Sequence, residues 1–287
     1  METRRGAGAF PKANTRPIMR PEPLTDMSSP RRVLRDLATA TAFLTRIPLA
    51  LEEPPQLMRT AWCFPVVGAG IGLFAGLVLA LAAWLGLPPL ACSLCALAAA
   101  AAATGALHED GLADLADGLG CPDPERRLAA MRDSRIGTWG VLALVLMIAL
   151  KSAAVAAILQ GAGALAALLA FVSALAAGRA AMVAAASVLE PACDDGLAHA
   201  AGHPEHRTAV FGLACAGGLL VVMLPVPAAA VVLVAALVGA AVVAGVASRT
   251  LGGYTGDVLG GMEQVAEILA LLALAAWFGA DPGMGPT

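Results

Sequence analysis

Three aspartates near the middle of the chain have the side-chain type and the spacing that magnesium chemistry requires. Asp110, Asp114 and Asp117 occupy positions i, i+4 and i+7 of the segment His108–Gly118. Because side chains at this spacing share one face of an α-helix, the sequence predicts a helix with an acidic stripe. Like charges on one stripe repel each other, and a hard divalent cation would offset that repulsion. We therefore expect the stripe to bind Mg²⁺ together with substrate phosphate oxygens; the alternative is an acidic face that contacts only water.

A second polar segment follows the stripe and suits phosphate binding. Met131–Thr138 carries Arg132, Asp133 and Arg135. Guanidinium forks bind phosphate oxygens in pairs, and a carboxylate beside them could complete a metal shell. The same arginines could instead only anchor a loop at a membrane surface.

A third polar segment, Gly252–Gly261, is rich in glycine around Gly256 and Asp257. Backbone amides of such a loop can form an anion-binding nest, so Gly256 is a candidate substrate contact and Asp257 a candidate catalytic acid. Glu263 and Glu267 follow, one helical turn apart, inside an apolar run. Ionisable groups at membrane depth are costly and usually face the interior of a helix bundle.

Further ionisable side chains lie in or beside apolar runs. His108 begins the acidic segment, and Lys151 and Arg179 each lie well inside an apolar run. With Glu263, they are candidate contacts for an anionic substrate, although a structural ion pair would explain the charged ones equally well.

The three polar segments together indicate one class of chemistry. Carboxylates, arginines and a glycine-rich loop suit metal-assisted transfer from a diphosphate-activated donor. Neither a Walker P-loop nor a Ser-His-Asp set is evident in the sequence. A protein nucleophile is therefore not what this sequence favours.

The composition indicates which elements must position these groups. Of the 287 residues, 59% are hydrophobic and 14% are charged, and the mean hydropathy is +0.79. Soluble domains average about 25% charged residues, so this chain lacks the charge to cover a water-facing surface. The sequence predicts an all-α integral membrane protein, a bundle of about seven transmembrane helices with its active-site loops on the cytoplasmic side.

Runs of about 20 apolar residues can cross the hydrocarbon core as helices. The predicted spans are Phe64–Leu87, Leu90–Leu107, Gly137–Leu159, Ala162–Leu189, Ala209–Leu224, Pro227–Ala247 and Met262–Phe278. Residues 1–31 are predicted to be a disordered basic tail. Residues 32–287 are predicted to form the polytopic transmembrane catalytic domain, which begins with an interfacial helix at Arg32–Leu44.

The distribution of positive charge predicts the orientation of the bundle. Of the 18 Lys and Arg residues, eight precede residue 36, which places the N-terminus in the cytoplasm. Alternating spans then return the segments 108–136, 190–208 and 248–261 to the cytoplasm. All three polar segments are thus expected on the cytoplasmic side.

Two long runs of this sequence resemble the cobalamin synthase family, adenosylcobinamide-GDP ribazoletransferase. They are TGALHEDGLADLADGLG at Thr104–Gly120 and RLAAMRDSRIGTWG at Arg127–Gly140. Four shorter runs resemble the family in the same order: FLTRIPL at 43–49, FPVVGAGIG at 64–72, ALKSAA at 149–154 and TGDVLGG at 255–261. The resemblance covers roughly residues 36–278.

This resemblance implies a multi-pass, Mg²⁺-dependent enzyme of the bacterial inner membrane. Such an enzyme joins adenosylcobinamide-GDP to α-ribazole or its 5′-phosphate and releases GMP, a late step of cobalamin biosynthesis. Carried over to this chain, the metal-binding acids would be Asp110, Asp114 and Asp117. The groups around the diphosphate would be Arg132, Asp133, Arg135 and, on the opposite wall, Asp257.

Two other classes of protein remain open. A CDP-alcohol phosphotransferase or a prenyltransferase also uses carboxylate clusters at a membrane face, although the D-x₃-D-x₂-D spacing here differs from theirs. A transporter would line a pathway with charged groups such as Lys151 and Arg179, but here the polar residues gather at one face. The expected partners are the small-molecule substrates and the lipid bilayer, with homo-oligomerisation left open and no nucleic acid.

Overall fold

The fold is built from helices joined by short connections. The computed structural model describes residues 29–49, 57–193 and 201–280. Within these ranges no β-strand forms, and an isolated bridge pairs Pro191 with Tyr254. The α-helices are α1 (Pro30–Leu44), α2 (Phe64–Trp84), α3 (Pro89–Thr104), α4 (Leu107–Gly120), α5 (Arg127–Met131), α6 (Thr138–Ala186), α8 (His206–Met223), α9 (Val226–Thr250) and α10 (Gly256–Ala280). The 3-10 helices η2 (Leu57–Cys63) and η3 (Pro124–Arg126) precede α2 and α5.

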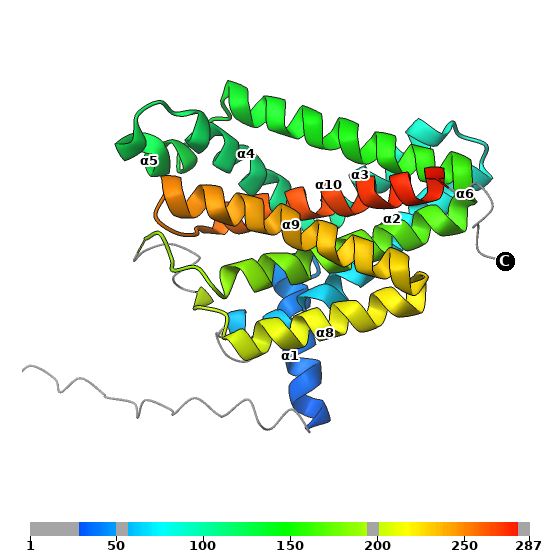
Figure 1. Cartoon of the computed structure of the whole chain (residues 1–287), viewed down its shortest axis with the longest axis horizontal. Helices are drawn as coiled ribbons and strands as arrows, with labels where there is room; N and C mark the ends of the chain where they lie inside the picture. The colour runs from blue at the N-terminus through cyan, green and yellow to red at the C-terminus, as the bar shows by residue number, and fades with distance from the viewer. Residues whose placement is uncertain (1–28, 50–56, 194–200, 281–287) are drawn as a thin grey trace, which may run out of the picture.

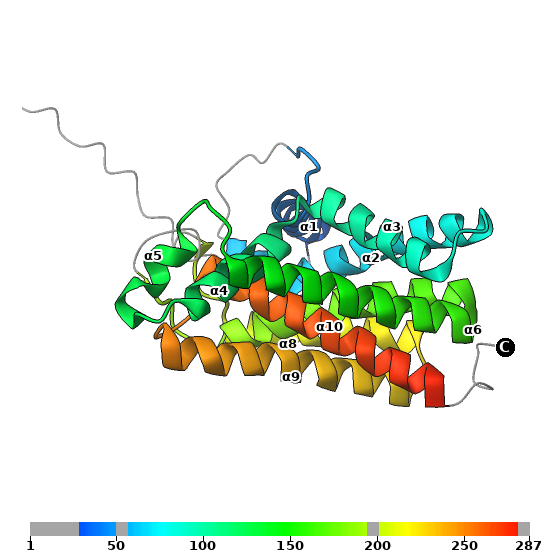
Figure 2. The same ribbon diagram turned by 90° about the horizontal axis from the view of Figure 1, so that it is seen from above.

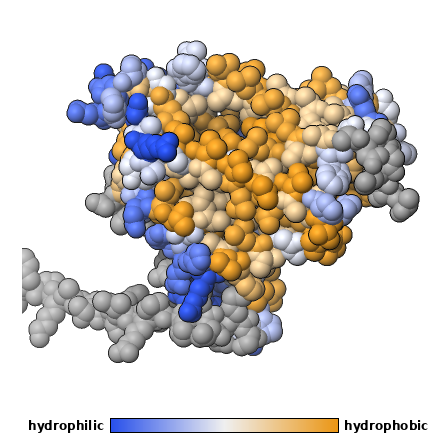
Figure 3. All heavy atoms as spheres, in the orientation of Figure 1, coloured by the Kyte–Doolittle hydropathy of each residue, from blue (hydrophilic) through white to orange (hydrophobic). Residues whose placement is uncertain are grey.

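Most of these helices are long and apolar enough to cross a membrane. Five described segments meet that test: Leu57–Trp84, Thr138–Ala186, His206–Met223, Val226–Thr250 and Gly256–Gly279. A sixth candidate is the pair α3 and α4, which is bent by 93°. Figure 3 shows apolar side chains in a broad area across the middle of the molecule, with hydrophilic residues gathered chiefly at the left. The prediction of an all-α integral membrane protein is confirmed.

Helix α6 accounts for two of the predicted spans. Its 49 residues contain one non-helical position, Gly163, with φ 87° and ψ 177°. A straight helix of this length would extend for more than twice the hydrocarbon thickness of about 30 Å. Figure 1 shows instead that the chain turns back, so that the two halves of α6 run in opposite directions. The break between the predicted spans Gly137–Leu159 and Ala162–Leu189 was misplaced by a few residues, because the positive φ is adopted by the later glycine, Gly163.

The second predicted span, Leu90–Leu107, is shorter than expected. Helix α3 has only 16 residues and ends at a corner where Gly105 and Ala106 have φ angles of 71° and 58°. A right-handed α-helix cannot continue through two residues with left-handed backbone angles, so α4 starts in a new direction. Arg46 stabilises the corner, because its backbone N–H donates to the Ala103 carbonyl at 2.8 Å and its side chain packs beside Gly105.

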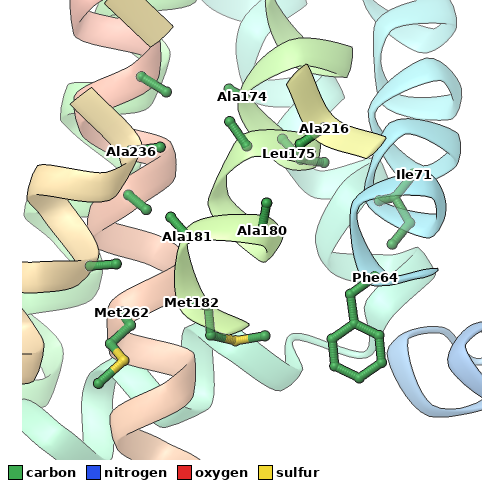
Figure 4. Packing of buried hydrophobic residues seen from close by; sticks show 14 of the residues in the cluster. Phe64, Ile71, Ala174, Leu175, Ala180, Ala181, Met182, Ala216, Ala236 and Met262 are labelled. Carbon is green, nitrogen blue, oxygen red and sulfur yellow. The ribbon is translucent and has the colours of Figure 1, made fainter. Parts of the chain in front are cut away.

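The core of the bundle is made largely of alanine. Figure 4 shows Ala174, Ala180 and Ala181 of α6 packed between α2, which contributes Phe64, and α10, which contributes Met262. All five side chains are at most 1% exposed. Small residues let helices approach closely, which is the usual packing between helices in a membrane. This close packing makes α6 and α10 the central scaffold on which the polar groups are mounted.

The N-terminal helix is confirmed as α1, beginning two residues before the predicted start. It carries a buried acid, Asp36, which accepts a hydrogen bond from the Trp62 indole N–H at 3.1 Å. The contact ties α1 to η2 and so to the start of α2. The predicted tail, residues 1–31, lies almost wholly outside the described residues.

One end of the bundle gathers the elements that carry the polar segments. Figures 1 and 2 both place α4, α5, the start of α6 and the start of α10 at the left-hand end. Segments far apart in the sequence therefore meet there. A functional site is therefore expected at this end of the bundle.

Candidate functional site

The acidic segment forms a helix, as its spacing predicted. Helix α4 buries Leu112 and Leu115 on one side and leaves Asp110 exposed. Asp114 and Asp117 are half-buried. The carboxylates thus line the side of α4 that faces away from its apolar contacts.

Helix α4 packs closely against the start of α10. A Cβ atom on Gly111 would lie 3.0 Å from both the Cα and the carbonyl oxygen of Asp257. A Cβ atom on Gly260 would lie 3.0 Å from the His108 carbonyl oxygen and 3.1 Å from the Gly111 Cα. Because neither glycine has a side chain, the two backbones touch and Asp257 is brought beside α4. Gly256 and the glycines after it are helical here, so the predicted glycine nest is replaced by a helix–helix contact.

We call Asp110, Asp114 and Asp257 the acid cluster. The charges of Asp110 and Asp257 both act on Asp114, and so does that of Asp117. Arg132 acts on Asp257 from the next loop and offsets part of the negative charge. Carboxylates gathered in this way repel one another, which is the electrostatic condition that a divalent cation relieves.

Asp117 serves a structural purpose that the spacing did not reveal. Its Oδ2 accepts a hydrogen bond from the Gly137 N–H at 2.6 Å, and its Oδ1 accepts one from the Gly140 N–H at 2.9 Å. Both N–H groups belong to the start of α6, whose first turn has no intrahelical partners. Asp117 therefore caps α6 from α4, with one oxygen accepting from each N–H group. Each carboxylate oxygen keeps a second lone pair, so metal binding by Asp117 together with Asp110 and Asp114 stays a prediction.

Residues 132–137, between α5 and α6, lie beside that cap and are here called the arginine loop. Arg135 donates to Asp133 through Nε at 3.1 Å and through its terminal nitrogen at 2.7 Å. The Arg135 side chain is 85% exposed and that of Asp133 40% exposed. Hydrogen bonds from Arg135 lower the pKa of Asp133 to about 2. The paired side chains present donors to the solvent-facing side of the site, where an anionic group could bind.

A second polar cluster, here called the buried network, lies inside the bundle. It consists of His108 from α4, Lys151 and Arg179 from α6, and Glu263, Gln264 and Glu267 from α10. Arg179 forms ion pairs with Glu263 at 2.7 Å and with Glu267 at 2.9 Å. Lys151 forms an ion pair with Glu267 and donates to Gln264 at 2.6 Å. His108 Nδ1 lies 3.4 Å from the Glu263 carboxylate.

The buried network changes the interpretation of four predicted substrate contacts. His108, Lys151, Arg179 and Glu263 are each at most 5% exposed. Their polar atoms point toward one another, and two cations face two anions. The structure therefore places these four residues in an internal ion-pair network and not on the open surface of the acid cluster. The structural ion pairs that the sequence left open for Lys151 and Arg179 are present, and substrate contact by any of the four residues stays a prediction.

Sequence reasoning missed the segment pairing beside the acid cluster. The Tyr254 N–H donates to the Glu190 carbonyl at 3.0 Å, and the Ala192 N–H donates to the Tyr254 carbonyl at 2.9 Å. The Tyr254 side chain is fully buried, and burial together with the charge of Glu190 raises its pKa. This pairing fixes the approach to Asp257 from the end of α6. A single tyrosine in a glycine-rich loop was the available signal.

The donor set suits Mg²⁺ only in combination with a ligand. Among the residues that the structure describes, no group of three or more His, Cys, Asp or Glu side chains could by itself hold a metal ion. Mg²⁺ commonly takes one or two protein carboxylates and completes its octahedron with water and phosphate oxygens. The acid cluster, open to solvent through Asp110, offers carboxylates of that kind. The geometry thus fits metal-assisted chemistry on a phosphate-bearing substrate.

Comparison with known proteins agrees with this chemistry. The model of the cobalamin-5-phosphate synthase family matches residues 36–275. The adenosylcobinamide-GDP ribazoletransferase of Bradyrhizobium diazoefficiens is 42% identical over 251 residues, which cover 86% of this chain and 95% of that protein. Those of Brucella ovis and Brucella canis are 41% identical and cover 84% of this chain and 96% of theirs. No solved structure matches this chain.

The match spans every element that builds the two polar clusters, from α1 through most of α10. Its identity to the curated relatives is well above the level at which only the fold would be shared. The chain is a multi-pass membrane transferase of cobalamin synthesis and belongs to the cobalamin-5-phosphate synthase family.

Proposed function

We propose that this chain joins adenosylcobinamide-GDP to α-ribazole or its 5′-phosphate in a Mg²⁺-dependent reaction. The products would be adenosylcobalamin, or its 5′-phosphate, and GMP. The curated relatives carry the name of this transfer. The observation that supports it most is the convergence of Asp110, Asp114 and Asp257, from two helices, at the open end of the bundle.

The proposed reaction is an in-line displacement at phosphorus. A ribazole hydroxyl oxygen forms a bond to the phosphorus nearer the cobinamide, while the bond from that phosphorus to the oxygen of GMP breaks. The hydroxyl proton passes to a carboxylate of the acid cluster, either directly or through water. GMP leaves with the bridging oxygen and its negative charge. Bonds and charge balance without an oxidant or a reductant.

Each group of the site has a task in this proposal. Arg132 and Arg135 bind the diphosphate oxygens, and Asp133 orients the Arg135 guanidinium through two hydrogen bonds. Asp110, Asp114 and Asp257 would hold Mg²⁺ together with the diphosphate. When bound, Mg²⁺ neutralises phosphate charge and polarises the bond that breaks. Asp117 keeps the arginine loop beside the acid cluster by capping α6.

The location we propose is the bacterial inner membrane, with the acid cluster facing the cytoplasm. The loop between α4 and α6 carries Arg126, Arg127, Arg132 and Arg135, whereas the turns 85–88, 160–163 and 224–226 at the opposite end carry no Lys or Arg. Positive charge in short loops favours the cytoplasmic side. Both nucleotide and corrinoid substrates would then reach the site from the cytoplasm.

The test is direct conversion by the purified protein. Protein in detergent is given adenosylcobinamide-GDP, α-ribazole 5′-phosphate and Mg²⁺, and GMP and the corrinoid product are measured by chromatography. We expect equimolar GMP and product, loss of both on addition of EDTA, and recovery on addition of excess Mg²⁺. Folded protein that leaves both substrates intact would overturn the proposal.

The same assay addresses the rival transferases. A CDP-alcohol donor or a prenyl diphosphate donor replaces adenosylcobinamide-GDP in parallel reactions. We expect neither to react, because the family match covers 240 consecutive positions, residues 36–275. Turnover of either donor in preference to the corrinoid would favour that rival class.

A further inference from the structure

The buried network and the acid cluster share one pair of helices. Helices α4 and α10 are antiparallel and touch where Gly111 faces Gly260. One turn toward the interior, His108 lies against Glu263, with 3.4 Å between Nδ1 and Oε2. The inner contact is therefore three residues from the glycine contact on both helices.

Two members of the acid cluster, Asp114 and Asp257, lie at the opposite side of the same glycine contact. Asp114 follows Gly111 by three residues, and Asp257 precedes Gly260 by three residues. The Asp257 charge acts on Asp114 at this level. Since three residues advance a helix by nearly one turn, the ion-pair level, the glycine level and the carboxylate level follow one another along the helix pair. A shift or rotation at the inner level would therefore be transmitted to the carboxylates.

We infer that the buried network is a positioning device, in which the His108–Glu263 contact sets how α4 lies against α10 and so holds Asp114 and Asp257 at one level. This inference rests on the proposed function, since it concerns the same site. His108 and Glu263 are assigned as positioning residues, because both are at most 5% exposed and Glu263 faces His108 and Arg179 inside the bundle. The acid cluster is the element whose geometry they fix.

The rest of the network holds the inner contact in place from two sides. Glu263 is tied to Arg179 in the second half of α6. Lys151, in the first half of α6, binds Gln264 and Glu267 on the same helix as Glu263. Because both halves of α6 bind α10, α10 can neither rotate nor slide without breaking an ion pair. Helix α4 is attached to this fixed helix through His108.

Stability alone does not account for the network. Replacing a buried ion-pair network by well-packed apolar residues is often neutral or stabilising. In the described part of the chain, the Arg179 Nε atom and the Glu263 Oε1 atom, although the latter forms an ion pair, have no hydrogen-bond partner. A network that is incompletely satisfied contributes less to stability than a complete one. Its directional contacts, by contrast, specify a single arrangement of three helices.

The test separates polar positioning from packing at residue 108. His108→Leu removes the contact to Glu263, and His108→Asn restores an amide N–H near the position of Nδ1. We expect His108→Leu to raise the half-saturating Mg²⁺ concentration about tenfold and to lower kcat on the order of 100-fold. His108→Asn is expected to recover most of both losses. Binding of Mn²⁺, followed by electron paramagnetic resonance, gives the same comparison without turnover.

A second variant perturbs the same geometry without touching the network. Gly111→Ala places a Cβ atom 3.0 Å from the Asp257 backbone and must move the two helices apart. We expect it to weaken Mn²⁺ binding in the same direction as His108→Leu. Gly217→Ala is its control, because a Cβ atom there meets nothing within 4 Å. Leu79→Ala, in the buried part of α2, controls for lost stability and is expected to leave metal affinity unchanged.

The outcomes distinguish this inference from the proposed function. If wild-type protein turns over but folded His108→Leu and Gly111→Ala both keep wild-type Mn²⁺ affinity and kcat, the positioning role is wrong. If His108→Asn behaves like His108→Leu, a polar contact to Glu263 is not what matters, and the inference also fails. A third outcome is that wild-type protein binds Mn²⁺ but does not convert the substrates, while His108→Leu and Gly111→Ala bind Mn²⁺ more weakly. In that case the proposed function fails and the positioning role stands.

Discussion

The buried network and two carboxylates of the acid cluster, Asp114 and Asp257, lie on opposite sides of one glycine contact, yet the charges of the two clusters are arranged in opposite ways. Inside the bundle, Lys151 and Arg179 balance Glu263 and Glu267, and all four are at most 4% exposed. At the open end, the carboxylates of the acid cluster repel one another, and Arg132 offsets only part of that repulsion at Asp257. A balanced cluster is complete without a ligand, whereas an unbalanced one is stabilised by a ligand of opposite charge. Charge balance therefore separates the structural cluster from the chemical one.

The largest expected effect comes from unbalancing the buried network. Lys151→Met removes one of its two cations and leaves Glu267 with only Arg179. Removing one partner of a buried pair costs about 3–5 kcal/mol, because the remaining charge stays buried. We expect a corresponding fall in the free energy of unfolding, measured by denaturant titration in detergent micelles. Lys151→Met combined with Glu267→Gln restores the balance and is expected to recover most of the loss.

No recovery in the double variant would mean that the individual contacts matter more than the net charge. A wild-type free energy of unfolding in Lys151→Met would contradict the comparison outright.

The next effect reverses the pattern at the acid cluster. Asp114→Asn removes one charge from a group of repelling carboxylates, so stability is expected to stay unchanged or rise by about 0.2–0.5 kcal/mol. The value of kcat is expected to fall by about two to three orders of magnitude, which is the usual effect of removing one group that stabilises the transition state electrostatically. The measurements are kcat and the free energy of unfolding on the same preparation. Glu125→Gln, at an exposed position of η3, is the control and is expected to change neither.

A loss of stability in Asp114→Asn as large as that in Lys151→Met would remove the distinction between the two clusters. Retention of full turnover by folded Asp114→Asn would exclude this carboxylate from the chemistry.

The sequence was sufficient for features that depend on local spacing. The i, i+4, i+7 pattern predicted the helix of Asp110 and Asp114, and the apolar runs predicted where most spans lie. Spacing could not predict that Asp117 caps α6, because its partners at Gly137 and Gly140 are 20 and 23 residues away along the chain. A contact of that kind depends on where α6 begins in space and not on the periodicity of α4.

The pairing of the internal charges was equally out of reach. Lys151 and Gln264 are 113 residues apart, and Arg179 and Glu267 are 88 residues apart. Hydropathy indicates that such residues must face the bundle interior, but not which of them meet. The meeting points depend on the register between helices, which in turn depends on where Gly111 and Gly260 let two backbones touch. A pair of glycines in separate segments carries no sequence signal of their contact.

A smaller effect is expected at the cap that connects the two polar loops. Gly137→Ala places a Cβ atom 2.4 Å from Asp117 Oδ1 and so expels the carboxylate from the start of α6. Loss of a helix cap typically costs about 0.5–2 kcal/mol. We expect a lower melting temperature and a moderate loss of kcat, since the arginine loop is displaced from the acid cluster. Gly161→Ala, whose Cβ atom meets nothing within 4 Å, is the matched control in the same helix.

Asp117→Ala sharpens this comparison. If Asp117 acts as a cap, the Asp117→Ala variant is expected to reproduce the lower melting temperature and kcat of Gly137→Ala, with an unchanged half-saturating Mg²⁺ concentration. An increase in that concentration confined to Asp117→Ala would return Asp117 to the metal ligands.

The smallest effect on stability is expected at the exposed Asp133–Arg135 pair. Exposed ion pairs contribute little, so Asp133→Asn is expected to leave the melting temperature unchanged. Because Arg135 lowers the pKa of Asp133 to about 2, any contribution to stability is present above the unfolded pKa of about 3.9 and is lost only as the pH falls toward 2. Between about pH 6 and pH 8 the carboxylate stays ionised, and its titration cannot shape the pH profile of the enzyme. Asp133→Asn is therefore expected to raise the KM for the corrinoid donor without shifting that profile, since the Arg135 fork loses its orientation but not its charge. A shifted profile would show that Asp133 exchanges a proton during turnover, and would place it with the acid cluster instead of with the arginines.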